Sequence, residues 1–159
     1  MTSTRTETDS LGSMQIPAEA AYGIHTARAT ANFPITGMLL RHYPEFIDAL
    51  AMTKKACALA NMELGVLDAA IGNAIVGACD ELLLGNGREF FIVDMLQGGA
   101  GTSTNMNANE VIANLALRRL GRPFGDYRSV SPNDHVNLSQ STNAGHPTAI
   151  RPDILSPCP

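Results

Sequence analysis

Apolar residues recur at helical spacing in the first long stretch without glycine, which begins at Pro44. Proline suits the first turn of a helix, where its missing N–H costs nothing. Steps of alternately four and three residues mark one face of a helix. The positions that follow this rhythm are Phe46, Leu50, Thr53, Cys57, Ala60 and Leu64. The pattern predicts a helix that ends near Gly65.

A second helix is predicted directly after the first. Asp68 is a good N-cap residue, and Gly85 suits the left-handed position that ends a helix. Between them the apolar stripe consists of Ile71, Ile75, Ala78 and Leu82. Because the connection around Val66 is short, we expect the two helices to be antiparallel neighbours.

A third helix, rich in asparagine, is predicted from Thr102 or Ser103, either of which can serve as the cap, to Leu120. Asn107, Glu110 and Asn114 are spaced by three and four residues and so share one face. An amide is most useful where a donor and an acceptor must both be satisfied in a partly buried place. This face therefore indicates a polar network or the wall of a ligand site rather than an idle surface.

The remaining segments are less regular. Residues 10–37 carry closely spaced Gly and Pro and predict a loop-rich amino-terminal segment. The apolar run 90–96 fits a strand or an extended crossing segment, and periodicity does not decide between them. Asn133 or Asp134 is expected to cap a fourth helical stretch. Its polar positions are His135, Asn137, Ser141 and Asn143.

Composition narrows the class of protein. A chain of 159 residues with 45% hydrophobic residues fits one ordinary globular domain. Charged residues make up only 16%, below the usual quarter, which suggests either a surface rich in Ala and Gly or one covered by another chain segment.

Charge and motif chemistry argue against several classes of protein. A net charge of −4 with scattered Lys and Arg argues against a nucleic-acid partner. The polar first ten residues lack the basic and then apolar pattern of a signal peptide, and no apolar run reaches the roughly 18 residues of a membrane span. We therefore expect a cytoplasmic protein with no membrane partner. No His or Cys pair has metal-ligand spacing, so we expect no metal and read Cys57, Cys79 and Cys158 as free thiols.

The glycine-rich segment 97–103, Gln-Gly-Gly-Ala-Gly-Thr-Ser, runs directly into the third predicted helix. Glycines let the backbone approach a ligand, and the first N–H groups of a helix favour an anion. A phosphate is not favoured, because the segment lacks a Gly-Lys-Ser/Thr ending. A carboxylate fits the same geometry, and a turn made only for tight packing is the alternative.

A second polar segment is Gln140-Ser141-Thr142-Asn143, four side chains that can all form hydrogen bonds to a carboxylate or an ammonium group. On its own this signal is weak, because such clusters commonly form turns or helix ends. A triad of Ser141, His146 and Asp153 is not favoured, since nothing resembles a nucleophile elbow.

Taken in order, these segments resemble the aspartase/fumarase superfamily over roughly residues 9–150. The resemblance rests on Tyr-Gly-Ile-His-Thr at 22–26, Lys-Lys-Ala at 54–56, the glycine-rich segment, Asn-Glu-Val-Ile-Ala-Asn at 109–114, Pro-Asn-Asp-His-Val-Asn at 132–137 and Gln-Ser-Thr-Asn at 140–143. Class II fumarases typically read Trp-Gly-Ala-Gln-Thr and Gln-Thr-Gly-Ser-Gly-Thr in the first and third of these. The sequence is thus more similar to the aspartate ammonia-lyases, with class II fumarases as the alternative.

The resemblance implies a mainly α fold whose complete form is a homotetramer built around a long helical bundle. It implies an amino-terminal lyase domain at 1–140 and the start of the bundle domain at 141–159. It also implies a small dicarboxylate substrate, L-aspartate or fumarate, with no cofactor. The positions that match the family's substrate-binding residues are Thr102, Ser141, Thr142 and Asn143.

The chain also departs from the family. Members run to several hundred residues, and the loop with their catalytic serine base lies beyond position 159, so no catalytic residue is assigned here. The Asp that usually follows Ser-Thr-Asn is Ala144 here, and three prolines interrupt the last nine residues. We therefore expect a truncated or frame-shifted chain that is inactive alone, or a non-catalytic binding or assembly fragment.

Overall fold

The computed structural model describes residues 3–97, 99 and 101–141, and these are mainly helical, as predicted. The elements in chain order are β1 (Thr4–Asp9), β2 (Gly12–Pro17), α1 (Ile24–Asn32), the 3-10 turn η1 (Leu40–His42), α2 (Pro44–Glu63), α3 (Ala69–Leu83), the 3-10 turn η2 (Arg88–Phe90), α4 (Thr102–Arg119) and the π-helical turn η3 (Pro132–Val136). The predicted bundle domain at 141–159 lies outside the described residues except for Ser141, and the boundary stays a prediction.

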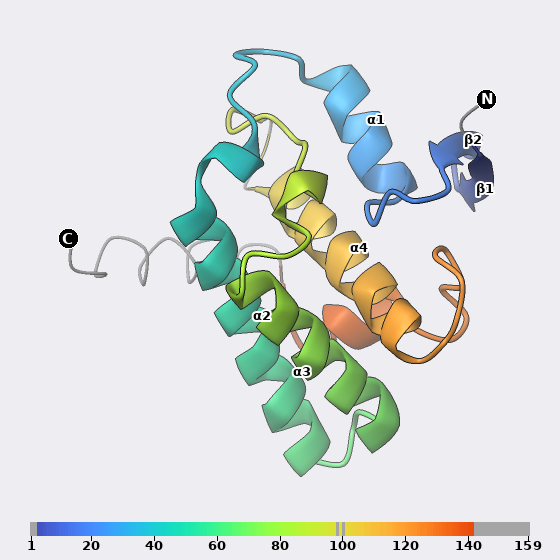
Figure 1. Cartoon of the computed structure of the whole chain (residues 1–159), viewed down its shortest axis with the longest axis vertical. Coiled ribbons are helices and arrows are strands. Elements are labelled where there is room, and N and C mark those ends of the chain that lie inside the picture. The colour runs from blue at the N-terminus through green and yellow to red at the C-terminus, as the bar shows by residue number, and fades with distance from the viewer. Residues whose placement is uncertain (1–2, 98, 100, 142–159) are drawn as a thin grey trace.

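The helices are arranged around α4. Helices α2 and α3 lie side by side, as their short connection predicts, and α3 packs on α4. On the other side of α4, α1 and the β1–β2 hairpin form a separate layer (Figure 1). Because α4 is covered from both sides, every residue from Asn107 to Leu117 is buried.

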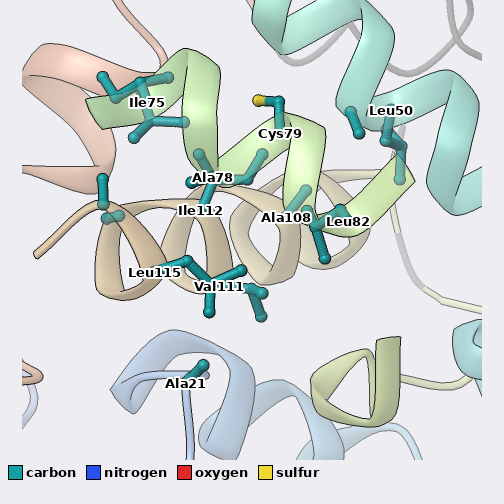
Figure 2. Close-up of a cluster of buried hydrophobic side chains, with 14 of the residues drawn as sticks. Ala21, Leu50, Ile75, Ala78, Cys79, Leu82, Ala108, Val111, Ile112 and Leu115 are labelled. Carbon is teal, nitrogen blue, oxygen red and sulfur yellow. The ribbon is translucent and has the colours of Figure 1, made fainter. Parts of the chain in front are cut away.

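The apolar core lies mainly between α3 and α4. Ile75, Ala78 and Leu82 of the predicted α3 stripe are all buried, and they face α4 in Figure 2. Val111 and Leu115 lie on the opposite side of α4, towards Ala21 (Figure 2). Close packing on two faces makes α4 the element that fixes the other helices relative to one another.

The buried face of α2 differs from the predicted one. Helix α2 begins at Pro44 as expected, but the last two positions of the predicted stripe, Ala60 and Leu64, are exposed. The interior face in the second half of the helix carries Lys54, Ala58 and Asn61 instead. The prediction failed there because it sought apolar residues, whereas two of these three are polar.

Two of the predicted caps are also wrong. Asp68 caps α3 as predicted, accepting hydrogen bonds from the N–H groups of Ala70 and Ile71 at 2.8 and 3.1 Å. Helix α4, however, begins with Thr102 as its first helical residue, and the cap position is Gly101. Within the described residues, the fourth stretch contains the short turn η3, whose cap is Ser131 rather than Asn133 or Asp134.

The amino-terminal segment is more ordered than its glycines and prolines suggested. It contains part of an antiparallel hairpin, in which Thr4 pairs with Pro17, and the nine-residue helix α1. Arg5 holds the hairpin against the chain that leads into α1, donating to the carbonyl oxygens of Ala20 and Tyr22 at 2.7 Å each. Contacts distant in sequence therefore order this segment.

The apolar run 90–96 is an extended crossing segment with one bridge, between Leu39 and Asp94, and not a strand of a larger sheet. Among the described residues, no helix is long and apolar enough to cross a membrane.

Candidate functional site

The glycine-rich segment turns directly into α4. Gly101 adopts a left-handed conformation, with φ of 81°, that side chains other than glycine rarely tolerate. This places Thr102 at the first position of the helix with its side chain exposed, and Ser103 next to it half-buried. The N–H groups of the first helical turn have no partner within the helix, so this end of α4 is suited to an anionic group.

Gln97 connects the residues before the glycine-rich turn to the first turn of α4. Its side-chain oxygen accepts a hydrogen bond from the N–H of Thr104 at 3.0 Å, and its side-chain nitrogen donates to the Thr104 hydroxyl and to the carbonyl of Asp94. One N–H of the first turn is therefore already used. The anion-binding capacity of the turn then rests on Thr102 and Ser103.

Asp94 anchors the segment that precedes the turn. Its carboxylate accepts hydrogen bonds from the N–H groups of Thr36, Gly37 and Leu96 at 2.7 to 2.8 Å, and from the Thr36 hydroxyl at 2.7 Å. Burial opposes the charge, but these hydrogen bonds outweigh it and lower the pKa of Asp94 to about 2. The carboxylate is thus ionised at neutral pH and holds the base of the turn in place.

A pocket of about 300 Å³ opens beside the start of α4. Thr102, Ser103 and Met106 line it from α4, and His25, Arg28 and Asn32 line it from α1, among other residues. The Arg28 guanidinium is already paired with Asp9 at 2.8 Å, and this bond lowers the pKa of Asp9. The hydroxyl groups of Thr102 and Ser103, the Asn32 amide and the His25 imidazole are among the groups that can bind a small polar ligand there.

The second predicted segment begins at the end of the described chain. Ser141 is exposed and lies just after η3 in irregular structure rather than in the predicted helix. Thr142 and Asn143 lie outside the described residues. Of the four predicted substrate-binding residues, the structure therefore places Thr102 and Ser141, each at the surface of its segment.

The two segments are connected through one buried ammonium group. Lys54 is only 1% exposed. Its ammonium nitrogen donates to the side-chain oxygens of Asn105, Asn137 and Gln140 at 2.8, 2.9 and 2.9 Å. Asn105 lies one turn after Thr102, so the same cation contacts the start of α4 and the chain that leads into Ser141.

The polar face of α4 forms a hydrogen-bonded network with the rest of the protein, and Glu110 also lines a pocket of about 470 Å³. Glu110 accepts hydrogen bonds from the N–H groups of Gly23, His25 and Thr26 at 2.9, 2.9 and 3.0 Å, so it occupies the N-terminus of α1. Asn114 donates to Ala21 and accepts from Gly125. This face is therefore not an idle surface, as predicted.

Glycine is required where α1 approaches this carboxylate. A Cβ on Gly23 would lie 2.7 Å from a Glu110 oxygen and 2.3 Å from the Tyr127 hydroxyl. Burial raises the pKa of Glu110, while its hydrogen bonds from α1 act in the opposite direction. Burial also raises the pKa of Tyr127, so its hydroxyl stays protonated and can donate to Glu7.

No cluster of three or more His, Cys, Asp or Glu side chains that might hold a metal ion occurs among the residues that the structure describes. Cys79 is buried and Cys57 half-buried, and both are free thiols. Cys158 lies outside the described part of the chain.

Sequence reasoning missed two residues of this region, Lys54 and His25, as contributors to the site. For Lys54 a signal was present, because it lies four residues after Leu50 and four before Ala58 on the interior face of α2. A lysine at such a position needs buried acceptors. For His25 no spacing rule applied, since its place beside Thr102 depends on the packing of α1 on α4.

Comparison with known proteins places these features in context. A family model described as lyase matches residues 12–156. The chain is 56% identical over 155 residues to an aspartate ammonia-lyase from a Bacillus species. This alignment covers 98% of this chain and 33% of that protein. It is 58% identical over 151 residues to the aspartate ammonia-lyase of Bacillus subtilis, covering 95% and 31%.

Solved structures agree with this. A fumarate lyase:delta crystallin from Brucella melitensis superposes with a TM-score of 0.95 at 55% identity, covering 96% of this chain and 36% of that chain. A class II fumarase from Schistosoma mansoni superposes with a TM-score of 0.88 at 38% identity, covering 96% and 32%. The predicted fold is thereby confirmed, and this chain spans about a third of the length of the curated relatives it matches.

Proposed function

Because this chain belongs to the lyase family whose model matches residues 12–156, we propose that it is the amino-terminal part of an aspartate ammonia-lyase. The reaction removes a proton from the carbon next to one carboxylate of L-aspartate and ammonia from the adjacent carbon, leaving fumarate. The observation that carries the proposal is the higher identity to aspartate ammonia-lyases, 56% and 58%, than to the class II fumarase, 38%.

The geometry at the start of α4 supports this chemistry. When the proton is removed, negative charge builds up on the neighbouring carboxylate, and hydrogen-bond donors already aimed at it stabilise the transition state. Thr102 and Ser103 offer hydroxyl groups at a helix N-terminus, beside a pocket that also contains His25. Such a site suits a carboxylate of a small dicarboxylate substrate.

We assign substrate binding to Thr102, Ser141, Thr142 and Asn143 and leave the catalytic base unassigned. In this assignment Thr102 holds one end of the substrate, and the other three residues approach from the segment after η3. The chemistry needs no cofactor, since a base and carboxylate-binding donors are sufficient for the elimination.

The complete protein is proposed to act as a homotetramer in the cytoplasm, with a domain boundary near residue 140. The free thiols of Cys57 and Cys79 fit a reducing compartment. Several large apolar side chains at the surface of the described residues, among them Met52 at 53% and Leu59 at 46% exposure on α2, fit a face that further protein covers.

A hybrid enzyme tests the proposal. Residues 3–141 would replace the matching region of the Bacillus subtilis aspartate ammonia-lyase, which supplies the rest of the protein. We expect the hybrid to form fumarate from L-aspartate, followed by ultraviolet absorbance, and not from L-malate. Activity on L-malate instead would favour a class II fumarase. A folded hybrid that is inactive on both, beside an active parent enzyme, would favour a non-catalytic binding or assembly fragment.

A further inference from the structure

Lys54 is a lysine in an unusual environment. It lies in the middle of α2, is 1% exposed, and forms no ion pair with a carboxylate among the described residues. A buried charge without a counter-charge is costly unless hydrogen bonds compensate for it. Here the ammonium has three N–H groups and three amide oxygens to receive them, so each donor is used.

The three acceptors come from the two segments that carry the candidate site. Asn105 lies three residues after Thr102 on α4, and Gln140 is the residue directly before Ser141. Asn137 links them further, because its oxygen accepts from both Lys54 and the Asn105 amide, at 2.9 and 3.1 Å. The lysine therefore contacts both segments within one residue or one helical turn of the proposed substrate-binding positions.

The segment from 137 to 140 also has hydrogen bonds of its own, because the Gln140 N–H donates to the Asn137 carbonyl and the Gln140 amide donates to the carbonyl of Val136. It follows the short turn η3, and Ser139 within it has a left-handed φ of 62°, which is unfavourable for a residue with a side chain. Asn61, the next interior polar residue of α2, donates to the carbonyl of Leu138 at 3.0 Å. The interior face of α2 thus adds polar contacts that connect this segment to the rest of the domain.

From these contacts we infer that Lys54 is a positioning residue, whose ammonium fixes the segment that leads into Ser141 relative to the first turn of α4. It does not contact substrate in this role. It sets the distance between Thr102 and the Ser141 segment, so that both can reach one dicarboxylate. The catalytic part of this statement rests on the proposed function, whereas the structural part is independent of it.

Hydrogen exchange measured by mass spectrometry on the purified 159-residue chain tests the structural part without any activity. Lys54→Met keeps the length of the side chain and removes all three donors. Hydrogen bonds from a charged donor are worth enough to change local opening by roughly tenfold or more. We expect at least that acceleration in a peptide that contains residues 136–141, with little change in α3.

Lys55→Met is the matched control. Lys55 is adjacent on the same helix, but its side chain is 33% exposed and pairs with Asp80 at 2.5 Å. This variant should leave exchange at 136–141 unchanged. Lys54→Gln is a second variant, which keeps a polar group on a shorter side chain. It should accelerate exchange at 136–141 as Lys54→Met does.

The outcomes separate the alternatives. Unchanged exchange at 136–141 in both Lys54 variants would overturn the inference, and so would equal loss of protection in α3, which would make Lys54 a general core residue. In the hybrid enzyme, Lys54→Met should raise KM for L-aspartate more than it lowers kcat. If the hybrid itself is inactive, the proposed function fails, while the exchange result still decides the role of Lys54.

Discussion

The strongest test of the polar interior is Glu110→Ala, because this one carboxylate connects α4 to the start of α1. It receives three backbone hydrogen bonds, from Gly23, His25 and Thr26, across 84 to 87 residues of sequence. No other side chain at the start of α1 replaces it fully, since the carboxylate of Glu7 accepts there from Ile24 only.

The magnitude follows from these contacts. Three hydrogen bonds to this carboxyl group suggest about 4.5–9 kcal/mol if each had the 1.5–3 kcal/mol of a bond to a charged group. They share one carboxylate whose burial is itself costly, so the sum overstates the effect. Glu110→Ala leaves the three N–H groups without their acceptor, and because an unsatisfied buried donor costs about 1–3 kcal/mol, we expect a loss of about 3–5 kcal/mol. At the lower limit, local opening of α1 should become roughly 100-fold more frequent, since each 1.4 kcal/mol is tenfold.

The assay is amide hydrogen exchange at residues 23–26, compared with exchange in α3 as an internal reference. Glu81→Ala is the control, because Glu81 is an acidic residue that pairs with Arg118 at the surface. Exposed ion pairs contribute at most about 1 kcal/mol, so this variant should change exchange little. Exchange at 23–26 within threefold of wild type in Glu110→Ala would refute the view that this carboxylate orders α1.

Three further predictions address charge and the site. Burial lowers the pKa of Lys54 to about 8 from an ordinary 10.5. Between these values the unfolded chain binds more protons than the folded one, so urea denaturation should show wild type gaining stability relative to Lys54→Met from pH 8 to 10; a parallel pH dependence would contradict this. Because the pKa of Asp94 is about 2, below an ordinary 3.8, its stabilisation is present above about pH 4 and lost towards pH 2. Asp94→Asn should therefore flatten the pH dependence of unfolding in that acidic window, and an unchanged acid transition would count against the role of Asp94. In the hybrid enzyme, Thr102→Val should lower kcat/KM for L-aspartate roughly tenfold to hundredfold, as expected for a lost donor to a carboxylate, and wild-type kinetics in a folded variant would remove Thr102 from the site.

Apolar periodicity, caps and glycine stops together predicted the three longest helices, although the periodicity assigned the wrong face to the second half of α2. Helix α2 begins at Pro44 and Asp68 caps α3, as the pattern predicted, and α4 begins at Thr102, one residue after its cap. These helices have locally readable starts, and apolar faces that pack on one another. The same patterns did not predict α1. The order of that segment depends on Glu110 and Arg5, which contact it from elsewhere in the chain.

The residues of the candidate site likewise differ in whether the sequence predicted them. Thr102 was predicted because a glycine turn that leads into a helix is a local pattern, readable without knowing the fold. The contribution of Lys54 was not predicted, although its position on α2 is visible in the sequence. Hydropathy assigns a lysine to the surface. The three amides that accept hydrogen bonds from Lys54 lie 51, 83 and 86 residues away in the sequence.

Buried polar groups are therefore the features of this chain that local patterns describe least and that the candidate site depends on most. Apolar contacts between α3 and α4 tolerate many arrangements of similar volume, so they stabilise the domain without fixing every segment. Lys54 and Glu110 are each hydrogen-bonded to three partners in specific places, and any other arrangement leaves a buried polar group unpaired. The segments that these two residues hold, the chain before Ser141 and the start of α1 with His25, are the ones beside the predicted substrate positions. When a site is inferred from sequence, a charged residue on the apolar face of a helix is thus a useful starting point. The residues that form hydrogen bonds with it are the first ones to identify.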